Sequence, residues 1–257
     1  GIPLLCAAVV FMLFDMTRID IAFSNLFYDP ITHTFPLDQV HFFERLTHKW
    51  ARIIPNWTAE VALIGAMLSC VWPLIDPGKR PRLAGFLERC RLAPVLRFAA
   101  GHRRDFWFVV FAFAICTGVI HFLKSHTGVY CPIETTLYGG KMDHIEWYSH
   151  FQLFKEAGDG RCWPGGHASA GFSLLALFFV LRDRRPRLAR AALVVALGLG
   201  SLFSLGRMLQ GAHFLSHNLW TLLIDWVICV LTYRWLLYRV PVTRRSYQQP
   251  VLGETCR

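Results

Sequence analysis

Six apolar runs dominate the sequence, and they restrict the chain to a helical membrane protein. The runs cover residues 2–14, 59–75, 106–123, 168–181, 191–205 and 219–237. Their lengths scatter around the roughly 20 residues that an α-helix needs to cross a bilayer. The 257 residues are 54% hydrophobic and 17% charged, which is too apolar for a soluble domain of this length. We therefore expect an all-α integral membrane protein with about six transmembrane helices in a single membrane domain, residues 1–257.

The first apolar run begins close to Gly1 and lacks the basic segment that precedes the core of a signal peptide. No convincing small-residue cleavage site follows it. We interpret the run as a transmembrane span that is shortened at its start, with a signal-peptide core as the alternative.

The net charge of +10 is concentrated in three connections, and this distribution argues against nucleic acid as a partner. The basic residues there are Lys79, Arg80, Arg82, Arg89, Arg91, Arg97, Arg103 and Arg104, then Arg182, Arg184, Arg185, Arg187 and Arg190, and last Arg239, Arg244 and Arg245. If the spans alternate, all three connections lie on one side, which the excess of positive charge identifies as cytoplasmic. We predict a multi-pass protein of a bacterial inner membrane whose other face is periplasmic.

Only two of the eight cysteines are expected in the oxidising periplasm. The other six, Cys6, Cys70, Cys90, Cys116, Cys229 and Cys256, lie inside apolar runs or on the cytoplasmic side. Cys131 and Cys162 flank the long polar loop between the third and fourth spans, so we predict that they form a disulfide. Closing such a loop stabilises the fold by ~3 kcal/mol in the chain-entropy estimate. Two unpaired thiols are the alternative.

Residues 40–54 have the pattern of an amphipathic helix in the outer interface of the membrane. Val40, Phe43, Leu46, Trp50 and Ile54 fall on one helical face, and charged residues occupy the rest. This interfacial helix could cover the mouth of a site between the spans, and the alternative is that its polar residues are only the solvated side of an interfacial helix.

Polar, histidine-bearing stretches introduce two of the spans at the predicted outer surface. Pro164 to His167 precedes the fourth span, where the glycines allow close backbone approach and the first helical N–H groups lack partners. Such a helix start attracts phosphate. Before the last span, His213 and His217 are one helical turn apart and follow Arg207. With Lys124 at the outer end of the third span, these residues predict a cationic pocket for phosphoryl chemistry.

We expect no metal and no cofactor in this pocket. The acidic ligands that magnesium or calcium prefers are missing from these stretches. His213 and His217 are suitable zinc ligands, but no third ligand is convincingly placed.

The order and spacing of these residues resemble the type 2 phosphatidic acid phosphatase superfamily, which carries the motifs K-x6-R-P, P-S-G-H and S-R-x5-H-x3-D. Here Lys124 is followed after six residues by Cys131-Pro132, then by Pro164-Gly165-Gly166-His167, and later by Arg207, five residues and His213. All motif positions fall within residues 124–217. The likeness is greatest to the membrane-associated bacterial lipid phosphatase branch, which has Cys-Pro in the first motif.

The resemblance implies a mechanism and a substrate class. His213 would attack phosphorus and form a phosphohistidine, and His167 would protonate the leaving group and later activate water. Lys124, Arg207 and the N–H of Gly166 would stabilise charge on the equatorial oxygens. The implied substrate is a membrane lipid phosphate or diphosphate, such as undecaprenyl diphosphate, phosphatidylglycerol phosphate, phosphatidic acid or lipid A.

Three positions depart from the family pattern. Cys131 stands where the family has a phosphate-binding arginine, and Arg161 or Lys141 is the candidate substitute. Gly165 replaces the serine, which removes a hydroxyl but leaves backbone donors to bind phosphate. His217 replaces the aspartate that would orient His213.

A neutral His217 imidazole would stabilise the developing charge on His213 less well than a carboxylate. Acids from the long loop could also serve, namely Asp143, Glu146 and Asp159. The departures keep two alternatives to a lipid phosphatase open: a phosphotransferase that passes the phosphoryl group to an acceptor lipid, and a non-catalytic lipid-binding protein. A transporter is disfavoured because the spans carry few charges, Asp225 being the main one.

Overall fold

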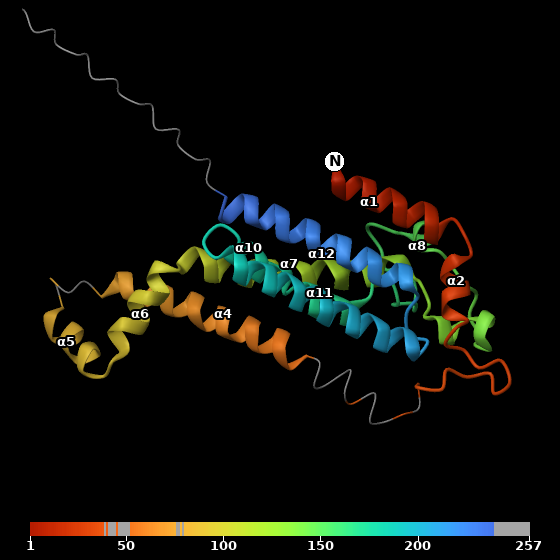
Figure 1. Cartoon of the computed structure of the whole chain (residues 1–257), viewed down its shortest axis with the longest axis horizontal. Coiled ribbons are helices and arrows are strands. Elements are labelled where there is room, and N and C mark those ends of the chain that lie inside the picture. Colours follow the sequence, from red (N-terminus) through yellow and green to blue (C-terminus); the bar gives the residue numbers. More distant parts are fainter. Residues whose placement is uncertain (39, 41–44, 46–51, 76–77, 79, 239–257) are drawn as a thin grey trace, which may run out of the picture.

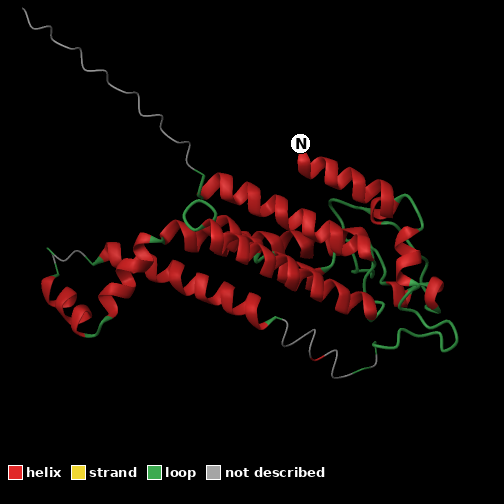
Figure 2. Cartoon of the chain, in the orientation of Figure 1, coloured by secondary structure: helices red, strands yellow, loops and turns green. Residues whose placement is uncertain are grey.

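A computed structural model describes residues 1–38, 40, 45, 52–75, 78 and 80–238 of the chain. Within these residues every regular element is helical, with α-helices, short 3-10 helices and one π-helical segment (Figure 2). The elements are α1 (Ile2–Val10), η1 (Phe11–Asp15), α2 (Ile19–Ser24), α4 (Ile53–Val71), η3 (Trp72–Leu74), α5 (Pro81–Arg89), α6 (Leu92–Gly101), α7 (Arg103–Thr127), η4 (Pro132–Glu134), η5 (Thr136–Tyr138), α8 (Trp147–His150), α9 (Gly166–Phe172), α10 (Leu175–Leu181), α11 (Pro186–Leu209) and α12 (Leu215–Leu236). The prediction of an all-α protein is confirmed.

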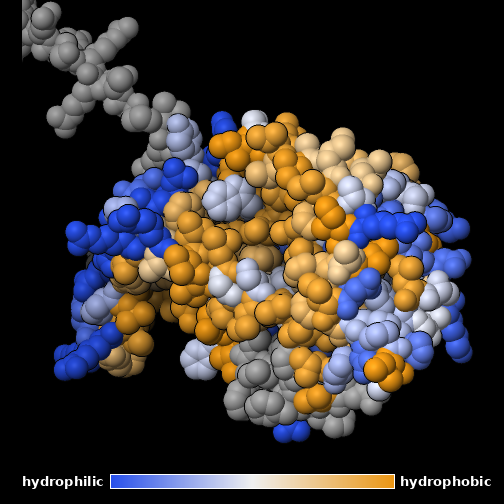
Figure 3. Space-filling view, turned by 45° about the vertical axis from the view of Figure 1, so that its right-hand side comes forward, coloured by the Kyte–Doolittle hydropathy of each residue, from blue (hydrophilic) through white to orange (hydrophobic). Residues whose placement is uncertain are grey.

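Four helices of the described residues are long and apolar enough to cross a membrane. They are the segments Ile53–Leu74, Arg103–Glu134, Pro186–Leu209 and Leu215–Leu236. They correspond to the second, third, fifth and sixth apolar runs, and in Figure 1 they extend along the long axis of the molecule. A hydrophobic band separates two hydrophilic ends on the face seen in Figure 3. The chain is therefore a membrane protein.

The first and fourth apolar runs form shorter helices than expected. They are Ile2–Asp15 and Gly166–Leu181. At 1.5 Å per residue, the 16 residues of the second segment extend about 24 Å, less than the ~30 Å hydrocarbon core of a bilayer. Six spans therefore remain a prediction.

The centre of the bundle is a close approach between α9 and α11. A Cβ atom on Gly171 would lie 2.5 Å from the backbone of Gly200, and one on Gly200 would overlap the ring of Phe172. Small residues allow helices to pack at such short range in membranes. This contact fixes α9, which carries His167 in its first turn, inside the bundle.

The basic ends of the helices are joined at the opposite end of the bundle from the predicted site. Arg184, in the turn between α10 and α11, donates two hydrogen bonds to the buried carboxylate of Asp105 at 2.6 and 2.9 Å. Arg104 donates to the carbonyl of Leu236 at the end of α12. These contacts hold α7, α10, α11 and α12 together below the predicted site.

The expected interfacial helix at residues 40–54 lies almost entirely outside the described residues, which include only residues 40, 45 and 52–54 of it. The first well-described helix after it is α4, which begins at Ile53.

Candidate active site

The predicted site residues are positioned by helix ends that meet at one end of the bundle. Lys124 lies in the last turn of α7, and Arg207 lies in the last turn of α11. His167 is the second residue of α9, and His217 lies in the first turn of α12. His213 lies in the short connection between α11 and α12. These ends lie together at the right of Figure 1, beside α8 and α2.

Hydrogen bonds connect the three motif-bearing stretches. The N–H of Cys162 donates to the carbonyl of Val129 at 2.8 Å. Ile133, directly after Cys131-Pro132, donates its N–H to the carbonyl of Gly211 at 2.9 Å. The first and second stretches, and the first and third, are therefore fixed to each other by backbone contacts, which are insensitive to side-chain identity.

The imidazole of His213 is buried at the junction of these stretches and is 4% exposed. Its Nδ1 lies 3.2 Å from Sγ of Cys162, and that sulfur is joined to Cys131 in a disulfide. Burial lowers the pKa of His213 well below its usual range, and the positive charges of Lys124 and Arg207 and the neighbouring histidines lower it further. These effects favour the neutral form of the His213 imidazole, which is the form that can act as a nucleophile.

His217 packs against His213 without a hydrogen bond between the two rings. The ring centroids are 5.8 Å apart in an edge-to-face arrangement, and Nδ1 of His217 is buried without a hydrogen-bond partner. The geometry differs from the expected one, in which His217 accepts a hydrogen bond from the His213 ring.

Lys124 crosses the start of α9. Its ammonium donates to the carbonyl of Arg161 at 2.7 Å, and a Cβ atom on Gly166 would lie 3.1 Å from its Cε. Glycine at position 166 thus leaves room for the lysine side chain beside the first residue of α9. A lysine and a helix start together form a favourable environment for an anion.

Arg207 is held by a neighbour on its own chain segment. Its Nη1 donates to Oε1 of Gln210 at 2.8 Å, and Gln210 is buried. This contact orients a guanidinium that is charged at every physiological pH.

Arg161, the candidate substitute for the missing arginine of the first motif, is placed differently from its expected role. Its side chain is 48% exposed and forms an ion pair with Glu156 at 3.0 Å. Its backbone carbonyl, and not its guanidinium, contacts Lys124. Lys141, the other candidate, is exposed.

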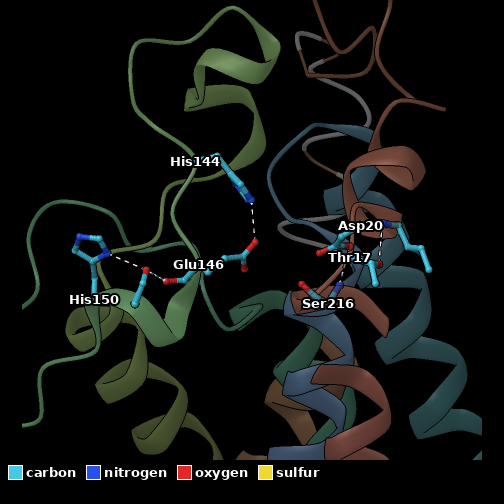
Figure 4. A network of polar contacts seen from close by, with 8 residues as sticks. Thr17, Asp20, His144, Glu146, His150 and Ser216 are labelled. Atoms are coloured by element: carbon cyan, nitrogen blue, oxygen red, sulfur yellow. Dashed lines mark hydrogen bonds and ion pairs between the residues drawn. The ribbon is translucent and has the colours of Figure 1, made fainter. Parts of the chain in front are cut away.

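The candidate acids of the long loop do not bond to His213 in the structure. Asp143 and Asp159 are exposed. Glu146 is half-buried, and its Oε1 lies 3.1 Å from Nε2 of His144, an interaction visible in Figure 4.

A larger residue at position 165 would require the side chain of Asn218 to move. A Cβ atom there would lie 2.5 Å from Oδ1 of Asn218 and 3.4 Å from Oγ1 of Thr221. Asn218 is buried, and its Nδ2 donates to the carbonyl of Phe214 at 3.1 Å. The side chain of Asn218 therefore fills the space that a serine at position 165 would need.

Two acidic residues near the site were not identified from the sequence. Asp15 accepts a hydrogen bond from Nε1 of Trp220 at 2.8 Å, and Asp20 accepts one from the N–H of Ser216 at 3.1 Å. Figure 4 shows the side chain of Asp20 beside Ser216 at the start of α12. Burial raises the pKa of Asp20 to about 6. The signal that could have found them is a pair of carboxylates directly after an apolar run.

A lateral groove of about 940 Å³ extends from the site between α4, α7 and α9. Its polar end includes Lys124, Gly166 and His167, and its apolar part includes Leu63, Val110, Phe113, Ala114, Gly118 and Ala170. The groove can therefore accept a molecule with an anionic head and an apolar tail.

One group of potential metal ligands occurs among the described residues. Ligand atoms of Cys162, His213 and His217 lie within 4.8 Å of one another. Because the sulfur is bonded in the disulfide, it is not the thiolate that zinc binds, and two nitrogens remain from the four ligands of a structural site.

Comparisons with known proteins identify a family and a distant relative. A family model described as PAP2 superfamily matches residues 105–241, from the first turn of α7 to beyond the end of α12. The lipid A 4'-phosphatase of Francisella tularensis subsp. novicida (strain U112) is 24% identical over 234 residues, which cover 89% of this chain and 91% of that protein. No solved structure matches the chain. The family match contains Lys124, His167, Arg207 and His213.

Proposed function

The chain belongs to the PAP2 superfamily, the type 2 phosphatidic acid phosphatases, and we propose that it is a metal-independent lipid phosphatase on the periplasmic face of a bacterial inner membrane. Membership makes the protein a phosphoric monoester hydrolase. The observation that best supports the proposal is that Lys124, Arg207 and His167 surround the buried His213 closely enough to lower its pKa.

The proposed reaction has two steps. The lone pair on Nε2 of His213 attacks phosphorus, and the bond between phosphorus and the lipid oxygen breaks while His167 donates a proton to that oxygen. Water then attacks the phosphohistidine, His167 accepts a proton from the water, and inorganic phosphate is released. Lys124, Arg207 and the N–H of Gly166 stabilise the charge on the equatorial oxygens, which supplies most of the catalysis in phosphoryl transfer.

The proposed substrate is a lipid whose phosphate reaches Lys124 while its tail lies in the lateral groove. The apolar lining of the groove supports an acyl or prenyl tail. The relative that is 24% identical is named a lipid A 4'-phosphatase, so lipid A is the first substrate to test. Undecaprenyl diphosphate, phosphatidylglycerol phosphate and phosphatidic acid complete the panel.

Phosphate release from this panel in detergent, with EDTA present, tests the proposal. Wild type is expected to release phosphate from at least one lipid, and the variants His213→Ala and His167→Ala are expected to be inactive. The matched control is His150→Ala, because His150 is an exposed histidine of α8. If wild type releases no phosphate and dephosphorylates the donor lipid only when an acceptor lipid is added and becomes phosphorylated, the phosphotransferase alternative replaces the proposal. Activity that persists in His213→Ala would contradict the mechanism.

A further inference from the structure

The disulfide that closes the long loop also contacts the proposed nucleophile. Sγ of Cys162 lies 3.2 Å from Nδ1 of His213, and both residues are buried, with Cys162 at 0% exposure. The carbonyl of Ala212 lies on the same sulfur at 2.8 Å. The sulfur therefore faces two polar atoms of the connection that carries His213.

A disulfide sulfur has no hydrogen, so it can accept a hydrogen bond but cannot donate one. In the contact between Sγ of Cys162 and Nδ1 of His213, only Nδ1 can therefore be the donor. A neutral imidazole carries one N–H, and placing it on Nδ1 leaves a lone pair on Nε2.

We propose that the disulfide between Cys131 and Cys162 positions His213, with Cys162 Sγ as the acceptor that holds the ring in the tautomer whose Nε2 is free to attack phosphorus. This inference rests on the proposed function. Cys162 is a positioning residue, because it contacts the nucleophile and not the substrate. In this role the sulfur replaces the carboxylate that would orient the histidine in the family pattern.

The neighbouring groups favour this assignment. His217 is not hydrogen-bonded to His213, and Glu146 is paired with His144. No carboxylate in the described part of the chain is hydrogen-bonded to the His213 ring, whereas Nδ1 contacts the sulfur. The low pKa of the His213 ring favours a neutral imidazole. In a neutral imidazole, the tautomer decides which ring nitrogen keeps its lone pair.

Reduction of the disulfide would change the direction of this hydrogen bond. A phosphine reductant and one water convert the S–S bond into two thiols, and the phosphine becomes a phosphine oxide. The thiol of Cys162 can then donate its S–H to Nδ1 of His213. That arrangement places the imidazole proton on Nε2 and blocks the lone pair needed for attack. The enzyme would therefore be active in its oxidised form.

Two double variants test the acceptor role separately from loop closure. Cys131→Ser/Cys162→Ala and Cys131→Ser/Cys162→Asp both lack the disulfide, but only the second supplies an acceptor for Nδ1–H. We expect kcat to fall at least about tenfold in the alanine variant, as losing the tautomer-holding group does in triad enzymes. In the aspartate variant kcat should recover to within about threefold of the oxidised wild type, with KM equal in the two variants. Equal kcat values in two folded variants would overturn the inference.

A direct measurement on the wild type keeps the inference testable if either variant fails to fold. Nitrogen-15 NMR spectra of histidine-labelled protein, compared with His213→Ala to assign the signal, report which ring nitrogen carries the proton. A proton on Nδ1 in the oxidised protein is expected, with a shift toward Nε2 after reduction. A proton on Nε2 in the oxidised protein would overturn the inference.

The controls separate this inference from the proposed function. All assays contain EDTA, so that zinc cannot occupy Cys162, His213 and His217 after reduction. The aspartate variant is also treated with the phosphine, and its kcat is expected to stay constant because it lacks the disulfide. Wild type that never turns over any lipid would contradict the proposed function, whereas active wild type with equal double variants contradicts only the role of Cys162.

Discussion

The backbone N–H of Gly165 donates to the hydroxyl of Thr221 at 2.8 Å, and this hydroxyl donates in turn to the carbonyl of His217 at 2.7 Å. The stretch that leads into α9 is therefore fixed to the second turn of α12. The N–H of Gly165 also lies 3.2 Å from the carbonyl of His217, and a Cβ atom on Gly165 would lie 2.5 Å from Oδ1 of Asn218, so three residues of α12 contact the start of α9. The side chains of α12 that lie beside position 165 thus favour glycine there.

Replacing Gly165 by serine tests this dependence. The new Cβ would lie 2.5 Å from Oδ1 of Asn218, so we expect Gly165→Ser to lower activity at least about tenfold, as small misplacements in an active site do. The double variant Gly165→Ser/Asn218→Ala removes the overlapping side chain and should recover most of this loss. Phosphate release from all variants measures the coupling.

The control for this pair is Gly198→Ser, because no atom lies within 4 Å of a Cβ atom added at Gly198. Additive losses in the double variant would contradict the packing explanation.

Gly118 provides a test of the lateral groove. It lines the groove, and a Cβ atom there would meet no atom within 4 Å, so a leucine can project into the space without disturbing α7. We expect Gly118→Leu to lower kcat/KM for long-chain lipid phosphates relative to short-chain analogues by about tenfold, the effect of a few displaced methylenes. Gly198→Leu on α11 is the matched control. An unchanged ratio of long-chain to short-chain kcat/KM would show that the tail lies elsewhere.

Asp20 should make the stability of the protein depend on pH. Its pKa rises from 3.8 to about 6 in the folded protein, so the folded state binds the proton more tightly than the unfolded state. The stability that this proton contributes is complete below about pH 4 and is lost as the pH rises through about 6. Asp20→Asn removes this dependence and keeps an acceptor for Ser216.

Thermal unfolding in detergent at several pH values measures the effect. The melting temperature of Asp20→Asn relative to wild type should increase between about pH 4 and 7. Asp20→Ala, which also leaves the Ser216 N–H without its acceptor, should be about 1–2 kcal/mol less stable than Asp20→Asn at every pH. A constant difference between Asp20→Asn and wild type would contradict the raised pKa.

The pH dependence of the chemical step should reflect the low pKa of His213. Burial is the main cause, and the guanidinium of Arg207 contributes, so the acid limb of kcat/KM should lie below the ordinary histidine pKa of about 6.5. Arg207→Gln removes one of the cations. Its residual activity should show the acid limb at higher pH. The control Arg187→Gln, an exposed arginine of α11, should keep the wild-type profile, and an identical limb in Arg207→Gln would argue against the electrostatic contribution.

Apolar length and motif spacing were sufficient to predict much of this protein. Helices α4, α7, α11 and α12 follow from long apolar runs, because a bilayer requires every backbone group to be paired within its own segment. The site was predictable because Lys124, His167, Arg207 and His213 occur at the ends of such runs.

Contacts between residues that are far apart in the sequence determine the features that the sequence patterns did not predict. The first residue of α9, Gly166, lies against the side chain of Lys124 on α7. The contact between Cys162 and His213 joins residues 51 positions apart, and that between Asp20 and Ser216 joins residues 196 positions apart. No local pattern encodes such distant pairs, so the orienting group of His213 was assigned by analogy to His217.

If His213 is the nucleophile, it forms a covalent bond to phosphorus, and the phosphoenzyme can be trapped. Wild type and His167→Ala are mixed with radiolabelled lipid phosphate, quenched in alkali after milliseconds to seconds, and mapped by mass spectrometry. We predict an acid-labile, alkali-stable phosphoryl group on His213, which accumulates in His167→Ala if some transfer persists because its hydrolysis is slowed. A phosphoryl group on another residue, or full turnover in His213→Ala, would contradict the account.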